Sequence, residues 1–338
     1  LTDVAETFIS DNKDQPFFLY MSHFAVHDPI HGRPDLTEKY KEKVASKQEP
    51  RGPSFILEGN PDDQPPLTRE RLNLLIREST HQGYQVLPQR TVKIKQNQDN
   101  IHFAAMVEAM DESLGRILQK LEDLGLADNT IIIFFSDNGG MSGANFGRAD
   151  RVVSEKELDT AFSTSNLPLR GAKGWLYEGG VRVPMIVKWP HKGKSGAVSQ
   201  EPVISVDFYP TMLEMAGLPA MPDQAVDGTS LVPAVMGEPL DTKPIFWHFP
   251  QYSNHGMQSP GGAVRIGDYK LLEYYENNTV QLFNLREDLG EQNDLSQTEP
   301  DKANELRALL NAWRTEVSAQ MPLPNAEYAI DPYPNQSK

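Results

Sequence analysis

The sequence predicts an α/β protein with a mostly parallel sheet flanked by helices, followed by a small α+β domain with an antiparallel sheet and one helix. An amphipathic helical pattern precedes one of three apolar runs, as in the crossover connections of parallel sheets. After Pro239 the pattern changes to short strands and then a helix. We therefore expect a large domain over 1–239 and a small one over 240–338. The three apolar runs have the length of buried strands and lie at 16–21, 130–135 and 184–189.

In the large domain, residues 1–10 fit the end of a helix that leads into the first strand. Residues 37–100 are polar and rich in Pro, Gln and Lys, which predicts a long excursion outside the core with a short helix at 69–77. Apolar positions from 103 to 121 recur every three or four residues and predict a helix before the second strand. A further helix is expected at 207–216.

The small domain is predicted as an antiparallel sheet covered by one helix. Asn277-Asn278 suits the tight turn between its last two strands. Pro300 starts a helix whose apolar positions again recur at steps of three and four. The tail from Met321 is proline-rich, and we expect it to be irregular. The four strands are expected at 245–249, 262–266, 269–275 and 280–285.

Composition argues against several classes of protein. The 338 residues include 32 Lys and Arg against 47 Asp and Glu, which gives a formal net charge of −15. Nucleic-acid binders and proteins that dock on anionic membranes depend on basic surfaces, so neither partner is expected. The absence of cysteine excludes disulfides, thiolate metal sites and a cysteine nucleophile. The chain begins at Leu1 rather than Met, from which we expect processing or truncation.

The strongest local motif follows the second strand. Residues 136–140 read Ser-Asp-Asn-Gly-Gly, and open α/β sheets build their sites at the carboxyl ends of strands. Asp137 and Asn138 offer oxygen ligands, which suit Ca²⁺ or Mg²⁺ better than zinc. A plain turn is the alternative, because Asp-Asn-Gly is favourable turn chemistry in any protein.

Two further motifs carry candidate catalytic groups. His23 and His27 follow the first strand, where a histidine is placed for acid–base chemistry or for binding an anion. Residues 169–184 are glycine-rich and carry Lys173, which could approach an oxyanion closely as a point charge. The spacing does not fit a Walker phosphate-binding loop. The alternatives are two structural histidines and a solvated surface loop.

The three motifs, in this order, resemble those of the sulfatases of the alkaline-phosphatase-like superfamily. Phe-Phe-Leu-Tyr at 17–20, Ser-Asp-Asn-Gly at 136–139 and Arg-Gly-x-Lys-Gly leading to Glu-Gly-Gly-x-Arg-Val-Pro at 170–184 are each characteristic. The resemblance continues through 206–211 and 267–271. Within the family, the sequence is most similar to the group of arylsulfatase A and N-acetylgalactosamine-6-sulfatase. It implies an alkaline-phosphatase-like fold and a sulfuric ester hydrolase that releases inorganic sulfate from a sulfated carbohydrate or aryl sulfate.

The resemblance also implies roles for single residues. Asp137 and Asn138 would be two ligands of an active-site Ca²⁺, with Mg²⁺ the less expected ion. Lys173 would bind a sulfate oxygen, and His27 would contact the sulfate and protonate the leaving alcohol, with His23 the competing candidate. The set is chemically coherent, because a cation and a lysine neutralise a dianion-like transition state while a histidine serves the leaving group.

Two elements of the family are missing ahead of the strand at 16–21. The family uses a formylglycine, made from Cys or Ser in a Cys/Ser-x-Pro-x-Arg motif, and an earlier Asp-Asp pair on the metal; neither precedes that strand. We therefore expect the C-terminal part of a sulfatase, inactive alone, whose partner is the missing segment of its catalytic domain. The resemblance implies a periplasmic or secreted location.

The small domain carries candidate substrate-binding residues. His248, His255 and Arg265 are of the types that bind sugar hydroxyls or anionic groups. Trp247 and Phe249 alternate with His248 along one strand, and we expect these two in the core.

Two other functions stay open. A phosphoesterase of the same superfamily would bind two zinc ions, for which the amide of Asn138 is a poor ligand. A non-catalytic relative that binds sulfated glycans would keep the cleft without the nucleophile. An upstream Cys/Ser-x-Pro-x-Arg motif would exclude the non-catalytic relative, and upstream zinc-type histidines would favour the phosphoesterase.

Overall fold

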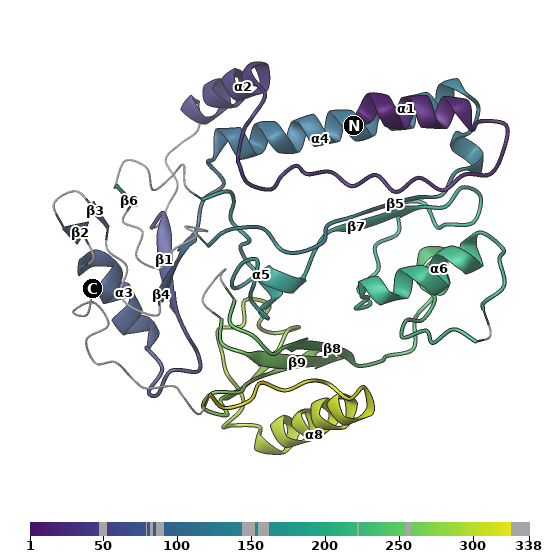
Figure 1. Ribbon diagram of the computed structural model, residues 1–338. Coiled ribbons are helices and arrows are strands. Elements are labelled where there is room, and N and C mark those ends of the chain that lie inside the picture. Colours follow the sequence, from purple (N-terminus) through teal and green to yellow (C-terminus); the bar gives the residue numbers. More distant parts are fainter. Residues whose placement is uncertain are drawn as a thin grey trace.

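The computed structural model in Figure 1 describes residues 1–46, 53–78, 80–81, 84–85, 91–143, 153–154, 162–221, 223–253 and 258–325. The C-terminal sheet and helix α8 (Pro300–Glu316) form one outer layer, and helices form the opposite one. Strands β5 (Ile132–Phe135) and β7 (Met185–Lys188) lie between these layers. The helices of the opposite layer are α1 (Thr2–Asp11), α2 (Pro34–Ala45) and α4 (Ile101–Asp123).

Helices α1 and α4 pack along each other through their apolar sides. Ile9 of α1 lies in one buried cluster with Ile117 and Leu121 of α4. The side chain of Asn100 caps α4 by accepting hydrogen bonds from the backbone amides at 102 and 103. Both helices were predicted, and both are confirmed.

The segment at 16–21 is extended but is not a strand, so that prediction is wrong. Phe17 and Leu19 pack against the α1–α4 cluster, whereas the alternate residues Phe18 and Tyr20 are 72% and 77% exposed. No backbone hydrogen bond joins 16–21 to another described residue. An apolar run specifies an extended chain, but a strand also needs a neighbour that supplies the hydrogen bonds.

The second and third predicted strands are present as β5 and β7, but they pair antiparallel rather than parallel. Phe135 stands opposite Met185 in this pair. A parallel pair needs a connection that carries the chain back to the other end of the sheet. Here the connection returns at the end where β5 finishes, and the amide of Ser136 donates to the carbonyl of Pro184 at 3.3 Å.

The excursion at 37–100 contributes to the core, contrary to the prediction. Strands β1 (Phe55–Gly59) and β4 (Thr91–Lys95) form an antiparallel ribbon in which Leu57 is buried. The lysines of β4 concealed this ribbon in the sequence. Nζ of Lys93 lies 3.9 Å from the ring centre of Phe55, so a lysine packs here against an apolar neighbour.

The rest of the excursion holds further short elements. Helix α3 (Arg69–Glu78) confirms the helix expected at 69–77. A separate small antiparallel sheet consists of three two-residue strands: β2 (Thr80–His81), β3 (Tyr84–Gln85) and β6 (Val153–Ser154).

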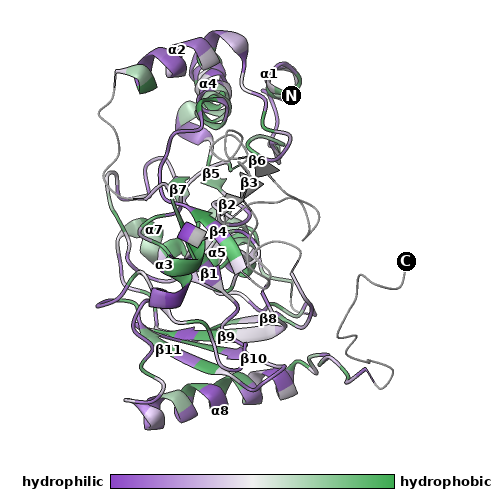
Figure 2. Cartoon of the chain, turned by 90° about the vertical axis from the view of Figure 1, so that its left-hand side faces the viewer, coloured by the Kyte–Doolittle hydropathy of each residue, from purple (hydrophilic) through white to green (hydrophobic). Residues whose placement is uncertain are grey.

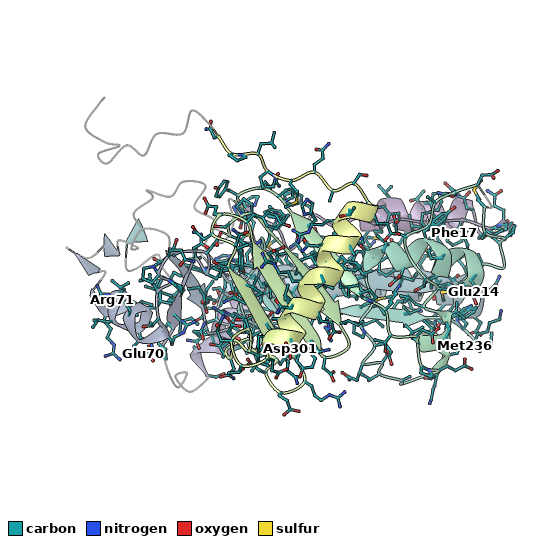
Figure 3. The ribbon with its side chains drawn as sticks, turned by 90° about the horizontal axis from the view of Figure 1, so that it is seen from below. Phe17, Glu70, Arg71, Glu214, Met236 and Asp301 are labelled. Atoms are coloured by element: carbon teal, nitrogen blue, oxygen red, sulfur yellow. The ribbon has the colours of Figure 1, made fainter. Side chains whose placement is uncertain are left out.

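The C-terminal sheet confirms the pattern predicted for the small domain. Its strand order is β11-β10-β9-β8, and all neighbours are antiparallel. Asn278, in the predicted turn, has a φ of 55°. Helix α8 lies across one face of the sheet (Figure 3) and packs Leu306 and Leu310 against it. The strands are β8 (Ile245–Phe249), β9 (Gly261–Ile266), β10 (Tyr269–Tyr274) and β11 (Val280–Asn284).

The other face of this sheet packs on the glycine-rich segment. Leu272 and Phe283 share a buried cluster with Trp175 and Tyr177, and Trp247 and Phe249 of β8 pack against it as predicted. Figure 2 shows α8 at the bottom, the sheet above it and the remaining elements above the sheet. The core is therefore continuous across the domain boundary that we predict after residue 239.

The remaining helical elements are short. Helix α6 (Phe208–Met215) confirms the helix expected at 207–216. No helix in the described parts of the chain is long and apolar enough to cross a membrane. The other short elements are α5 (Glu178–Val181), α7 (Val232–Met236) and the 3₁₀ turns Ala127–Asn129 and Ser205–Asp207.

Candidate active site

The Ser-Asp-Asn-Gly-Gly loop leaves the end of β5 and is held by its own polar groups. The Ser136 hydroxyl donates to the Asn138 carbonyl at 3.1 Å, and Oδ1 of Asp137 accepts from the Asn138 amide at 2.9 Å. The Asn138 side chain donates to the Gly139 carbonyl at 3.0 Å. Among the described residues, none donates to Oδ2 of Asp137 or to Oδ1 of Asn138. These two oxygens are therefore open to a cation.

The glycine-rich segment lies directly against this loop. The Lys173 amide donates to the Gly140 carbonyl at 3.1 Å, and the Gly139 amide donates to the Gly180 carbonyl at 3.0 Å. A Cβ on Gly139 would lie 1.8 Å from the carbonyl oxygen of Gly179, so only glycine permits this approach. Because these glycines have no side chains, the backbone that carries Lys173 can lie next to the backbone that carries Asp137 and Asn138.

A network of buried charged side chains holds the glycine-rich segment in place. Nζ of Lys270 lies 2.9 Å from Oε1 of Glu178 and 3.1 Å from Oε1 of Glu291, and all three side chains are buried. Burial alone would raise the pKa of Glu178, but the charge of Lys270, with those of Arg265 and Arg182, lowers it. Burial raises the pKa of Glu291 against the opposing charge of Lys270. One lysine therefore serves two carboxyl groups of unequal acidity.

Arg170 attaches the same segment to the loop after β11 and to the β1–β4 ribbon. Its guanidinium lies 4.2 Å from the ring centre of Tyr177 and donates to the Glu291 carbonyl at 2.7 Å. It also pairs with Glu58 of β1 at 3.1 Å. The side chains of Arg170, Trp175 and Tyr177 thus anchor the segment, whereas Lys173 reaches His27 on another part of the chain.

Lys173 and His27 meet directly. Nζ of Lys173 lies 2.9 Å from Nε2 of His27, and Nδ1 of His27 lies 3.0 Å from the carbonyl oxygen of Asp28. Because a carbonyl only accepts, Nδ1 carries the proton, and Nε2 accepts a hydrogen bond from the Lys173 ammonium group. The turn that places His27 is closed by its amide, which donates to the Phe24 carbonyl.

His23 points elsewhere. Its Nε2 lies 3.5 Å from the hydroxyl of Ser113 on α4, and this hydroxyl is hydrogen-bonded to Thr2 of α1. Burial, with a smaller contribution from the N-terminal charge, lowers the pKa of His23. Of the two histidines that competed in the sequence, the structure brings His27 to Lys173.

A metal site at Asp137 and Asn138 fits a hard cation only in part. One carboxylate and one amide oxygen are suitable donors for Ca²⁺ or Mg²⁺, but such ions take six or more ligands. The described residues contain no group of three or more His, Asp or Glu side chains that could hold a metal. These two residues would thus be a minority of the ligands.

The predicted substrate-binding residues lie apart from this cluster. Nδ1 of His248 is 3.0 Å from the Tyr275 hydroxyl, and Nε2 is 2.8 Å from the Gln320 carbonyl, so both ring nitrogens are occupied. Arg265 is 3.5 Å from Glu178 and belongs to the buried charge network. His255 lies outside the described residues. The structure therefore gives His248 and Arg265 internal contacts and does not bring them to Lys173.

The sequence reasoning missed the network of Glu178, Lys270 and Glu291. Glu178 and Lys270 lie in segments of the family resemblance, but a charged residue carries no local sign that it is buried. Only their three-dimensional proximity shows that they are buried together.

Comparisons with known proteins agree with the fold and the motifs. The family model described as Sulfatase matches residues 1–218, and the one described as N-sulphoglucosamine sulphohydrolase, C-terminal, matches residues 172–318. The chain is 32% identical to a protein of Formosa agariphila named Sulfatase, over 99% of this chain and 53% of that protein. It is 35% identical to the N-acetylgalactosamine-6-sulfatase of Canis lupus familiaris, over 48% of this chain and 27% of that protein.

Solved structures confirm the predicted fold class. The structure of Ps i-CgsB in complex with k-i-k-neocarrahexaose has a TM-score of 0.61 and 26% identity, over 92% of this chain and 53% of that one. A protein solved with its substrate D-glucosamine-2-N,6-O-disulfate has a TM-score of 0.64 and 22% identity, over 95% of this chain and 70% of that one, and shows the fold alone. The chain spans about half the length of the first two curated relatives that it matches.

Proposed function

Because the chain belongs to the sulfatase family, we propose that it forms part of the active site of a sulfuric ester hydrolase. The substrate class is a sulfated carbohydrate or aryl sulfate, in line with the names of its relatives. The observation that carries the proposal is the 2.9 Å contact between Lys173 and His27, beside a loop with two open oxygen donors. A cationic group, an imidazole and a hard-cation site are what a sulfate ester requires.

Lys173 would bind a sulfate oxygen. In the structure its ammonium group has the lone pair of His27 as its partner. A sulfate oxygen is a stronger partner, because a charged acceptor makes a shorter and stronger hydrogen bond than a neutral one. Substrate binding would therefore take the ammonium group away from Nε2 of His27.

His27 would then serve the leaving group. Once Lys173 is bound to sulfate, Nε2 is free to take a proton from solvent, while Nδ1 stays bonded to the Asp28 carbonyl and fixes the ring. The nucleophile from outside this sequence would form the new bond to sulfur as the S–O bond to the alcohol breaks, and the alcohol oxygen would take the proton from Nε2. The backbone contact at Nδ1 makes the ring orientation independent of substrate.

Asp137 and Asn138 would hold a Ca²⁺ ion, with Mg²⁺ second. When bound, such an ion supplies positive charge near the sulfate oxygens. The remaining ligands and the formylglycine nucleophile would come from a segment outside this sequence, since the chain has no cysteine and no Ser-x-Pro-x-Arg motif. We accordingly propose that the chain alone does not hydrolyse sulfate esters. We also propose, from the family likeness, that the whole enzyme is periplasmic or secreted.

The test is sulfate release by the N-terminally extended protein and by this chain alone. We expect the extended protein to hydrolyse nitrophenyl sulfate and a sulfated monosaccharide, and the chain alone to hydrolyse neither. Nitrophenyl phosphate as the preferred substrate, with zinc as the required ion, would favour the phosphoesterase. Binding of sulfated glycans without turnover by the extended protein would favour the non-catalytic relative.

A further inference from the structure

The side chain of Asn166 lies between the two active-site loops. Its Nδ2 is 2.8 Å from the Gly140 carbonyl oxygen and 2.9 Å from the Gly179 carbonyl oxygen. The carbonyl of Gly171 and the hydroxyl of Ser142 are each 3.3 Å away. An amide nitrogen carries two protons, so the two shorter contacts account for both of them.

The two carbonyls belong to different parts of the site. Gly140 is two residues after Asn138, in the loop with the cation-binding oxygens. Gly179 follows Glu178, in the segment that carries Lys173. One side-chain amide therefore bridges the backbone of both loops at the point of their close approach.

The site is shaped for this amide. A Cβ on Gly140 would lie 2.6 Å from Oδ1 of Asn166, so a side chain at 140 would displace it. Asn166 is itself held by a turn in which the Leu169 amide donates to its carbonyl at 2.9 Å. A carboxylate of the same shape would place acceptors against two carbonyl oxygens and repel both.

We infer that Asn166 is a positioning residue, which fixes the Asp137–Asn138 loop relative to Lys173 through its two donated hydrogen bonds. Its effect on catalysis rests on the proposed function, whereas its effect on the loops does not. Asn166→Asp is the informative variant, since it keeps the size and removes both donors. Asn129→Asp is the matched control, because Asn129 is exposed, its side chain forms no hydrogen bond with a described residue, and it undergoes the same change of charge.

Hydrogen exchange on this chain tests the loop contact directly. The Gly139 and Lys173 amides bond across the two loops, and we expect Asn166→Asp to speed their exchange at least tenfold. The amides of α8 should keep their protection, which separates local loosening from a failure to fold. Asn129→Asp should change neither set. Unchanged protection of Gly139 and Lys173 in Asn166→Asp, or no protection of them in the unaltered chain, would overturn the inference.

Activity of the extended protein separates this inference from the proposed function. We expect Asn166→Asp to lower kcat for sulfate release at least tenfold with a smaller change in KM, and Asn129→Asp to leave both unchanged. If the exchange pattern is as expected but the unaltered protein releases no sulfate, the proposed function fails and the positioning role stands. A normal kcat in Asn166→Asp with loosened loops would overturn the link to catalysis.

Discussion

Nζ of Lys173 lies 2.9 Å from Nε2 of His27, although 146 positions separate the two residues. Each group has an independent support: Lys173 stands on a segment fixed by buried charges, and His27 is bonded through Nδ1 to the Asp28 carbonyl. The fold therefore brings the two functional nitrogens together. An oxyanion with several oxygens could bind both groups at this place.

Replacement of Lys173 tests its role as the cation that binds sulfate. In the extended protein, Lys173→Ala is expected to lower kcat/KM for sulfate release about 10²- to 10³-fold, because a positioned charge is lost from the transition state. Lys13→Ala is the control, since Lys13 is exposed and forms no ion pair with a described residue. Equal activity of both variants would contradict the role of Lys173.

Replacement of His27 tests its role as the acid for the leaving alcohol. We expect His27→Ala to slow hydrolysis of a sulfated sugar about 10²- to 10⁴-fold. Nitrophenyl sulfate should suffer much less, because nitrophenolate leaves without a proton. The control is His31→Ala, at an exposed histidine. An equal loss on both substrates would show that His27 serves binding and not proton transfer.

The carboxyl groups of Glu178 and Glu291, which both contact Lys270, should respond differently to replacement by glutamine. At pH 7, Glu178→Gln is expected to cost roughly 3 kcal/mol of unfolding free energy, because it removes the charged partner of a buried lysine. Glu291→Gln should cost less, because burial raises the pKa of Glu291 and its ionisation opposes folding. Urea unfolding of both variants and the unaltered chain measures these differences.

The pH dependence of the same variants has opposite signs. The pKa of Glu178 is lowered by folding, so its contribution to stability is present above its unfolded pKa and is lost as the pH falls through the folded value. The pKa of Glu291 is raised, so its contribution is present at low pH and is lost as the pH rises. Glu291→Gln should therefore gain stability relative to the unaltered chain as the pH rises from about 4, the ordinary pKa of a carboxyl group, to about 7. A loss over that interval would contradict the assignment.

Two glycines test the close approach of the active-site loops. Gly139→Ala is expected to cost about 3 kcal/mol, because its Cβ would overlap the carbonyl oxygen of Gly179. Gly115→Ala should add about 0.5–1 kcal/mol, because Gly115 lies in α4 with nothing within 4 Å of the new atom. Thermal unfolding of both variants provides the comparison. A harmless Gly139→Ala would mean that the loops are not held this closely.

Local patterns were sufficient for much of the fold. Helix α8 and strands β8 to β11 follow their apolar periodicity to within one residue of most predicted bounds, because each signal lies within one short segment. The strand prediction at 16–21 was wrong because an apolar run does not show whether a neighbouring strand supplies hydrogen bonds. The direction of β7 against β5 depends on how a connection of about fifty residues turns back, which no local pattern specifies.

The candidate site was predictable only in its motif residues. His27, Asp137, Asn138 and Lys173 were found from their places after predicted strands or in a glycine-rich segment, and the family resemblance implied their roles. Lys270 and Asn166 were not, because a buried lysine and a bridging amide look like surface residues until their partners are known. Their roles depend on contacts across 92 and 26 positions, respectively.

The most direct test of the central claim is a crystal structure of the extended protein with Ca²⁺ and a sulfated monosaccharide. We expect the sulfate group to lie between Nζ of Lys173 and Nε2 of His27, about 3 Å from each. We expect the cation to be bound by the side-chain oxygens of Asp137 and Asn138. A sulfate group bound elsewhere on the molecule, with Lys173 still bonded to His27, would contradict the account.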